Sequence, residues 1–177
     1  AVHSITTAAI NYSVHNTRWC TNLNQAISLA GGGNTIYLLR DLTDNTTATL
    51  SGKSVYFTPY GHTLTRNVTI TVNSGCTFVI NGSGKISSNT TIITNKGNFK
   101  AEGPTLTTSG AVATIRAYSN GYTNITGGTI YNTNTSVNSL ASCIIGTGGY
   151  SGTISASGCT IAAKGADSCG IIQGGHG

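Results

Sequence analysis

The sequence contains very little charge. Asp, Glu, Lys and Arg together make up 7% of the 177 residues, whereas an ordinary soluble domain contains ~25%. Nine basic and four acidic residues give a net charge of +5, but the basic residues are spread along the chain. Because a nucleic-acid surface needs clustered cations, no nucleic-acid partner is expected. Solubility must therefore depend on hydroxyl and amide side chains.

Long apolar runs and methionine are also missing. No run approaches the ~20 residues of a membrane-spanning helix, so no membrane insertion is expected. No basic segment followed by an apolar segment opens the chain, as it would in a signal peptide. The lack of Met, even at position 1, is typical of a processed or excised chain. The 24 Gly and the many Thr, Asn and Ser favour strands and turns over helices.

Short apolar segments recur in sets of three, with a period of ~20 to 29 residues. Three very short strands cannot form a stable sheet alone, but they can pair with their equivalents in the next repeat. This pattern predicts an all-β fold, a right-handed parallel β-helix (solenoid) of about six rungs. The right hand follows from the crossover rule for parallel strands. A β-sandwich is the competing all-β fold. Three successive sets are 77–80, 85–87, 91–93; then 97–100, 105–107, 113–115; then 123–126, 129–131, 143–145.

The same alignment predicts the residues that point into the core. Residues 78, 99, 125 and 154 are expected to form one column along the solenoid axis. The inward residues are predicted to be Val55, Phe57, Leu64, Ile70, Phe78, Ile80, Ile86, Ile92, Leu106, Ile115, Ile125, Ile130, Ile144, Ile154, Ile161 and Ile171.

The first part of the chain follows a different period. Leu23, Ala26, Ile27 and Ala30 are spaced i, i+3, i+4 and i+7, which predicts a short amphipathic helix. Thr21 or Asn22 can cap its start, and three glycines at 31–33 end it. We therefore expect an N-terminal segment, 1–33, whose helix covers the end of a β-helix at 34–177. That single β-helix domain is expected to be open or continued at its C-terminus.

Several phrases of the sequence are similar to a known group of proteins. Residues 23–27 and 33–43, with 61–65 (GHTLT) and 126–130 (TGGTI), resemble pectate-lyase-like right-handed parallel β-helix regions in secreted and surface proteins of Gram-positive bacteria. The resemblance implies a fold and an extracellular or cell-surface location. It implies no reaction, because this fold carries many functions.

Catalytic groups are scarce. Lyases on this fold bind calcium through clustered carboxylates, and the hydrolases place carboxylates side by side. Asp41, Asp44, Glu102 and Asp167 are the only acidic residues, and no two occupy equivalent positions of neighbouring repeats. The four histidines are scattered, without the spacing of a metal site. We therefore predict that the chain is not an enzyme, with no catalytic residue, no metal site and no cofactor.

The five cysteines leave at least one thiol without an intramolecular partner. Cys143 and Cys169 occupy similar places in successive repeats, at a separation that a disulfide permits. Two buried thiols explain the same positions equally well. Cys20, beside Trp19 in the capping segment, is the candidate for an intermolecular bond.

Tyrosines in the later repeats are candidates for sugar contacts. Tyr118, Tyr122, Tyr131 and Tyr150 supply flat rings, and the connections near them lengthen from repeat to repeat, as on a binding face. The alternative is that Phe99, Tyr122 and Tyr150, each near a glycine, form a stacked ladder at one corner.

These observations favour a non-catalytic extracellular module with a structural or adhesive role. Its expected partner is another copy of itself, stacked end to end in a filament, or the rest of a longer surface protein; glycans are a further candidate. The alternatives are a fragment of a carbohydrate-active enzyme, such as a polysaccharide lyase or hydrolase, and a glycan-binding module.

Overall fold

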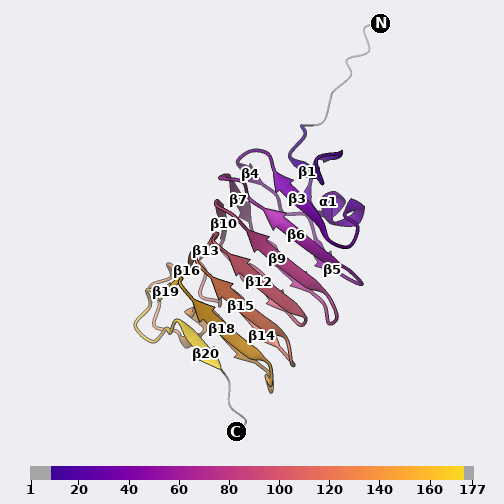
Figure 1. Cartoon of the computed structure of the whole chain (residues 1–177). Helices are drawn as coiled ribbons and strands as arrows, with labels where there is room; N and C mark the ends of the chain where they lie inside the picture. Colours follow the sequence, from indigo (N-terminus) through magenta and orange to yellow (C-terminus); the bar gives the residue numbers. More distant parts are fainter. Residues whose placement is uncertain (1–8, 174–177) are drawn as a thin grey trace, which may run out of the picture.

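The computed structural model describes residues 9–173 and confirms a parallel β-helix of about six turns. Each turn contributes one strand to each of three sheets, which run along the solenoid (Figure 1). Sheet A has the order β18 (Thr153–Ser157), β15 (Tyr122–Thr126), β12 (Asn98–Glu102), β9 (Thr77–Asn81), β6 (Ser54–Thr58), β3 (Asn34–Leu38), β1 (Tyr12–Val14) and β2 (Arg18–Cys20).

The other two sheets contain parallel strands only. Sheet B has the order β19 (Thr160–Ala163), β16 (Thr129–Asn132), β13 (Thr105–Thr108), β10 (Lys85–Ser88), β7 (Thr63–Arg66) and β4 (Leu42–Thr43). Sheet C has the order β20 (Ile171–Gln173), β17 (Ile144–Thr147), β14 (Ile115–Tyr118), β11 (Ile93–Asn95), β8 (Ile70–Val72) and β5 (Ala48–Leu50). A 3-10 turn, η1 (Ser139–Ala141), lies in the long connection between β16 and β17.

In-register pairing places like residues above one another in the core. Leu64, Ile86, Leu106 and Ile130 form one buried column in sheet B. In sheet A, Phe78 is aligned with Phe99, and their ring centroids are 6.2 Å apart. Phe57 is aligned with Ile80 in the neighbouring column, and its ring centroid lies 6.4 Å from that of Phe78. Since alternate residues of a strand point to opposite faces, each strand gives the core one to three side chains.

One predicted column of the core is wrong. Phe78 and Phe99 share a column, but the next residue in it is Thr123, followed by Ile154; Ile125 lies in the neighbouring column. The buried Thr123 hydroxyl accepts a hydrogen bond from Asn95 Nδ2, at 3.0 Å. A satisfied polar pair therefore replaces an apolar side chain inside the solenoid.

The predicted aromatic ladder is also wrong, because Tyr122 aligns with Asn98 and Thr153 on the outer side of sheet A. At the other end of the core, the inward residues of the last described turn are less covered than expected. Ile154 and Ile161 are partly buried, and Ile171 is 41% exposed. Within residues 9–173, no strand pairs with the outer edges of β18, β19 and β20.

The predicted capping helix is present as α1 (Leu23–Leu29). The Asn22 side chain caps its start by accepting a hydrogen bond from the Gln25 amide, at 2.9 Å. Leu23, Ala26 and Ile27 are buried. Lys53 Nζ donates to the carbonyls of Ile27 and Ala30, at 2.7 and 2.9 Å, and so satisfies the end of the helix.

An antiparallel hairpin, β1–β2, precedes the helix and was not predicted; its strand β1 also pairs antiparallel with β3. His15 and Asn16 form its turn with φ of 50° and 55°, and the Thr17 amide donates to the Val14 carbonyl. Residues 14–17 thus form a tight turn with positive φ at both central positions, which Asn tolerates well, and three residues connect the paired Val14 and Arg18. The hairpin covers the edge of β3, so that the parallel part of sheet A is not exposed there.

Phe78→Ala tests the stacked interior. Removing this ring, which lies near those of Phe57 and Phe99, leaves a cavity, and we expect a loss of about 3 to 5 kcal/mol in the free energy of unfolding. The control Tyr60→Ala changes a ring that is 68% exposed and should cost less than about 1 kcal/mol. Urea unfolding followed by circular dichroism measures both. Equal losses in the two variants would contradict the described core.

Candidate functional site

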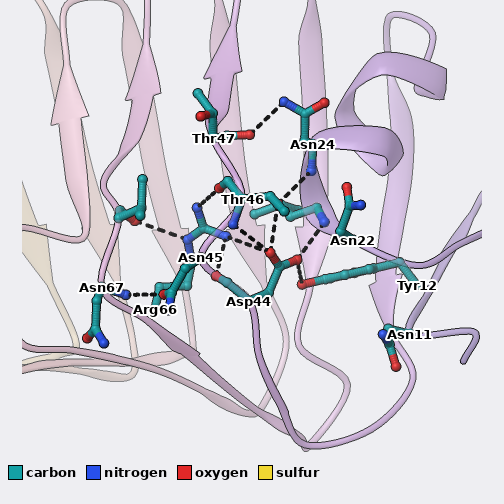
Figure 2. Close-up of polar contacts among 12 residues, drawn as sticks. Asn11, Tyr12, Asn22, Asn24, Asp44, Asn45, Thr46, Thr47, Arg66 and Asn67 are labelled. Carbon is teal, nitrogen blue, oxygen red and sulfur yellow. Dashed lines mark hydrogen bonds and ion pairs between the residues drawn. The ribbon is translucent and has the colours of Figure 1, made fainter.

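A cluster of connected polar side chains lies where the cap meets the first turns (Figure 2). Asp44 follows β4, and its carboxylate is buried. Its Oδ2 accepts hydrogen bonds from the Tyr12 hydroxyl, at 2.7 Å, and from the Leu23 amide, at 2.6 Å. Its Oδ1 accepts from the amide and the hydroxyl of Thr46, at 2.9 and 2.6 Å. One carboxylate thus joins the hairpin, the first turn of α1 and the loop after β4.

Arg66, at the end of β7, completes the cluster from the next turn of the solenoid. Its guanidinium is buried and donates to the carbonyls of Asp44, Thr46 and Val68, at 2.9, 2.6 and 3.1 Å. Its Nη1 lies 3.9 Å from Asp44 Oδ1, which makes a buried ion pair. We call Tyr12, Asp44, Thr46 and Arg66 the cap junction.

The protonation states in the cap junction suit a structural role. Burial alone raises the pKa of Asp44, but hydrogen bonds from Thr46, Tyr12 and Leu23 outweigh it and place the pKa below its ordinary value. Burial, followed by the bond to Asp44, raises the pKa of Tyr12, which stays a neutral donor. Burial also lowers the pKa of Arg66, although a guanidinium remains charged in proteins. Asp44 and Arg66 form hydrogen bonds with other groups of the protein, and both have backbone groups among their partners.

A second acidic residue lies on an open corner. Asp41 Oδ1 accepts a hydrogen bond from the Thr63 amide, at 2.8 Å, and lies 3.6 Å from His62 Nδ1. The Asp41 side chain is 77% exposed, so this pair contributes little to stability. Asp41 also lines a shallow groove of about 440 Å³, together with Leu42, Thr43, Thr63 and Thr65.

The lining of the groove contains one carboxylate, that of Asp41, and the His62 imidazole lies beside this carboxylate but is not a lining residue. A glycosidase needs two carboxyl groups on either side of the scissile bond, ~5 to 10 Å apart. Asp44 is committed to the cap junction, while Glu102 and Asp167 are exposed in later turns of the solenoid. Among residues 9–173, no group of three or more His, Cys, Asp or Glu side chains could hold a metal ion. His3 and His176 lie outside the described residues.

The predicted sugar-binding tyrosines do not form one surface. Tyr118, Tyr122 and Tyr131 are partly buried and lie on sheets C, A and B, respectively. The prediction is wrong for Tyr150, which is buried and donates its hydroxyl to the Gly121 carbonyl, at 2.7 Å. Its ring packs so closely on Gly146 that any side chain there would overlap it.

All five thiols are free in the structure, which favours unpaired thiols over a bond between Cys143 and Cys169. Cys143 donates its backbone amide to the Cys169 carbonyl, and the next residue pairs with Ile171. This places Cys143 opposite Gly170, so that Cys143 is buried while Cys169 is exposed. Cys20 is buried as well, and the neighbouring Trp19 is the exposed residue, which removes Cys20 as a ready partner for a second chain.

Aromatic side chains gather at the N-terminal end of sheet A, which the sequence analysis did not predict. Trp19 and Tyr37 are both aligned with Ser13, one on each side, and therefore share a face. Tyr56 lies on the outer side of the adjacent strand β6, and Tyr60 follows that strand. We call Trp19, Tyr37, Tyr56 and Tyr60 the aromatic face. The alternation of side chains along β2, β3 and β6 is the only sequence signal for this face. Using that signal requires the register of the hairpin.

Comparison of the chain with protein-family models, curated proteins and solved structures gave no match. The resemblance to pectate-lyase-like regions therefore stays a prediction from the residues alone. Within residues 9–173, no helix is long and apolar enough to span a membrane.

Asp44→Asn tests the cap junction. Because the folded-state pKa of Asp44 lies below its ordinary value of 3.8, its ionised form stabilises the fold above about pH 4, and this contribution is lost as the pH falls through the folded-state pKa. We expect Asp44→Asn to lose about 3 kcal/mol at pH 7 and to show a weaker decline in stability in acid. Urea unfolding at several pH values measures both effects. The control Asp41→Asn should keep the wild-type profile; matching profiles for all three proteins would contradict the assignment.

Thiol labelling tests the cysteine assignments. Burial raises the pKa of Cys143 to about 11 and also raises the pKa of Cys20, so neither thiol should react in the folded protein. With Ellman's reagent at pH 8, we expect rapid reaction of Cys169, slower reaction of Cys159, and all five thiols after denaturation. A denatured chain with only three thiols would show that a disulfide forms, and rapid labelling of Cys20 would contradict its burial.

Proposed function

We propose that the protein is a non-catalytic structural module of an extracellular or surface protein, in which the solenoid acts as a stiff spacer with adhesive side faces. The observation that carries this proposal is the continuous parallel pairing from β3 to β18. Such a ladder fixes the spacing of every turn and leaves three elongated faces rich in hydroxyl and amide groups. The extracellular location rests on the sequence resemblance alone, since five free thiols do not favour an oxidising compartment.

The last described turn supports a role in which more solenoid follows. Ile154, Ile161 and Ile171 are only partly covered, and the outer edges of their strands have no partner among residues 9–173. Another β-helix turn, with parallel strands and inward apolar residues, fits this end best. That turn comes either from the rest of a longer surface protein or from a second copy stacked end to end.

A carbohydrate-active enzyme is the second candidate, and the Asp41–His62 pair beside its groove is the observation that favours it. Within residues 9–173, the groove lacks the second catalytic group that an enzyme of this class needs. Asp41 also accepts a backbone hydrogen bond from Thr63, and no second carboxylate faces the same groove. The pair could exchange a proton with a bound hydroxyl, but the general acid and base of glycoside cleavage need two positioned groups.

Assembly and activity assays together test the proposal. We expect purified protein at high concentration to form end-to-end particles in electron micrographs and light scattering if a second copy covers the last turn. Ile171→Lys places a charge on the surface that would be buried and should keep the protein monomeric, whereas Val137→Lys, at an exposed loop position, should not. A wild-type protein that stays monomeric would contradict self-stacking and leave the spacer of a longer chain.

The same preparation should release no reducing ends from neutral or acidic polysaccharides. Release that is lost in Asp41→Asn would contradict the non-catalytic assignment and favour the enzyme.

A further inference from the structure

We propose that a cleft beside the aromatic face is a binding site for a neutral saccharide. The cleft has a volume of about 320 Å³ and is lined by Asn16, Tyr37, Leu39 and Tyr60. This volume lies at the lower end of the range of small-ligand pockets, ~300 to 1,000 Å³. The inference does not depend on the structural role proposed above, because it concerns one side of the N-terminal turns.

The two rings in the cleft form an L-shaped surface. The centroids of Tyr37 and Tyr60 are 6.2 Å apart, and their planes are at 87° to each other. Tyr60 is 68% exposed and Trp19, on the same side of sheet A, is 56% exposed. Aromatic rings of this size normally bury most of their area, so a group of exposed rings beside a cleft indicates a contact surface.

A tight turn with a strained backbone positions Tyr60. Tyr60 has a φ of 55°, Gly61 a φ of 82°, and the His62 amide donates to the Pro59 carbonyl at 3.0 Å. A tight turn of this kind favours Gly, Asn or Asp at both central positions, and a bulky residue there costs about 1 to 2 kcal/mol. The edge-to-face contact with Tyr37 leaves Tyr60 68% exposed, so packing offsets little of this cost, and a role in binding accounts for the ring at this position.

The chemistry of the lining selects the ligand. Among the described residues, no charged side chain lines the cleft, so the lining offers nothing to neutralise a phosphate or a uronic acid. The Asn16 amide and the two phenol hydroxyls can donate to and accept from sugar hydroxyls. The ring faces can cover the apolar C–H face of a pyranose, and Leu39 adds apolar contact. A neutral pyranose has both of these surfaces, while a purely apolar ligand would leave the polar groups unpaired.

Two turns position the cleft from opposite sides. Asn16 belongs to the hairpin turn between β1 and β2, and Tyr60 to the turn after β6. Tyr37 on β3, which pairs with both β1 and β6, forms the part between them. Because these turns are anchored on paired strands, the cleft is formed before a ligand binds, which lowers the ordering cost of binding.

Saturation-transfer NMR on the whole chain tests the site. The probes are cellobiose, lactose, maltose and diacetylchitobiose, with galacturonic acid and indole as charged and apolar comparisons. We expect a saturable signal from at least one neutral disaccharide, with a Kd of about 1 mM, an ordinary value for so small a site. Tyr60→Ala should raise this Kd about tenfold or more, equivalent to about 1.4 kcal/mol, and Tyr60→Phe should retain most of the binding because the ring face remains.

Val137→Ala is the control, since it changes a side chain that is 71% exposed in the connection between β16 and β17 and should leave the Kd unchanged. Unchanged thermal unfolding of Tyr60→Ala separates loss of the site from loss of the fold. The inference is overturned if no neutral disaccharide binds, if Tyr60→Ala and wild type bind equally, or if galacturonic acid or indole binds more tightly. None of these results bears on the spacer role, which the assembly assay tests.

Discussion

The structure depends on parallel pairing in register between strands of two to five residues. A strand of this length has no stability alone, and each gains hydrogen bonds and a covered core face only from the turns on either side. The column of Leu64, Ile86, Leu106 and Ile130 results from this pairing, because each residue is aligned with the next one on the neighbouring strand. The pairing also explains the composition, because an unpaired charge is too costly in the core and the corners and outer faces tolerate Asn, Gly, Ser and Thr.

A solenoid built in this way must be closed where its pairing stops. At the N-terminal end, the hairpin covers the edge of β3, α1 packs against β5, and the cap junction ties both to the first two turns. Asp44 and Arg66 are two of the chain's thirteen charged residues, and both are buried there. A buried ion pair adds little net stability compared with apolar packing. Its value here is geometric, since backbone groups of separate segments meet on it.

Repetition made the fold predictable, whereas the candidate sites depended on register. The period of the apolar segments located the strands, and the spacing of Leu23, Ala26 and Ile27 located α1. A repeat period does not determine the register of a strand to within one residue. Ile125 was therefore predicted in the column that Thr123 occupies. For the same reason, Cys143 and Cys169 were expected to be register partners, and the aromatic face was not predicted. Its rings come together only through the registers of β1 with β3 and of β3 with β6. Tyr150 became a core residue because Gly146 leaves room for its ring.

Backbone contacts between register partners, measured by NMR on isotope-labelled protein, test the stacked in-register arrangement most directly. The account predicts nuclear Overhauser contacts from Ile86 to both Leu64 and Leu106, and from Thr123 to both Phe99 and Ile154. Contacts from Ile125 to Phe99 in place of Thr123, or an antiparallel pattern between β7, β10 and β13, would contradict it.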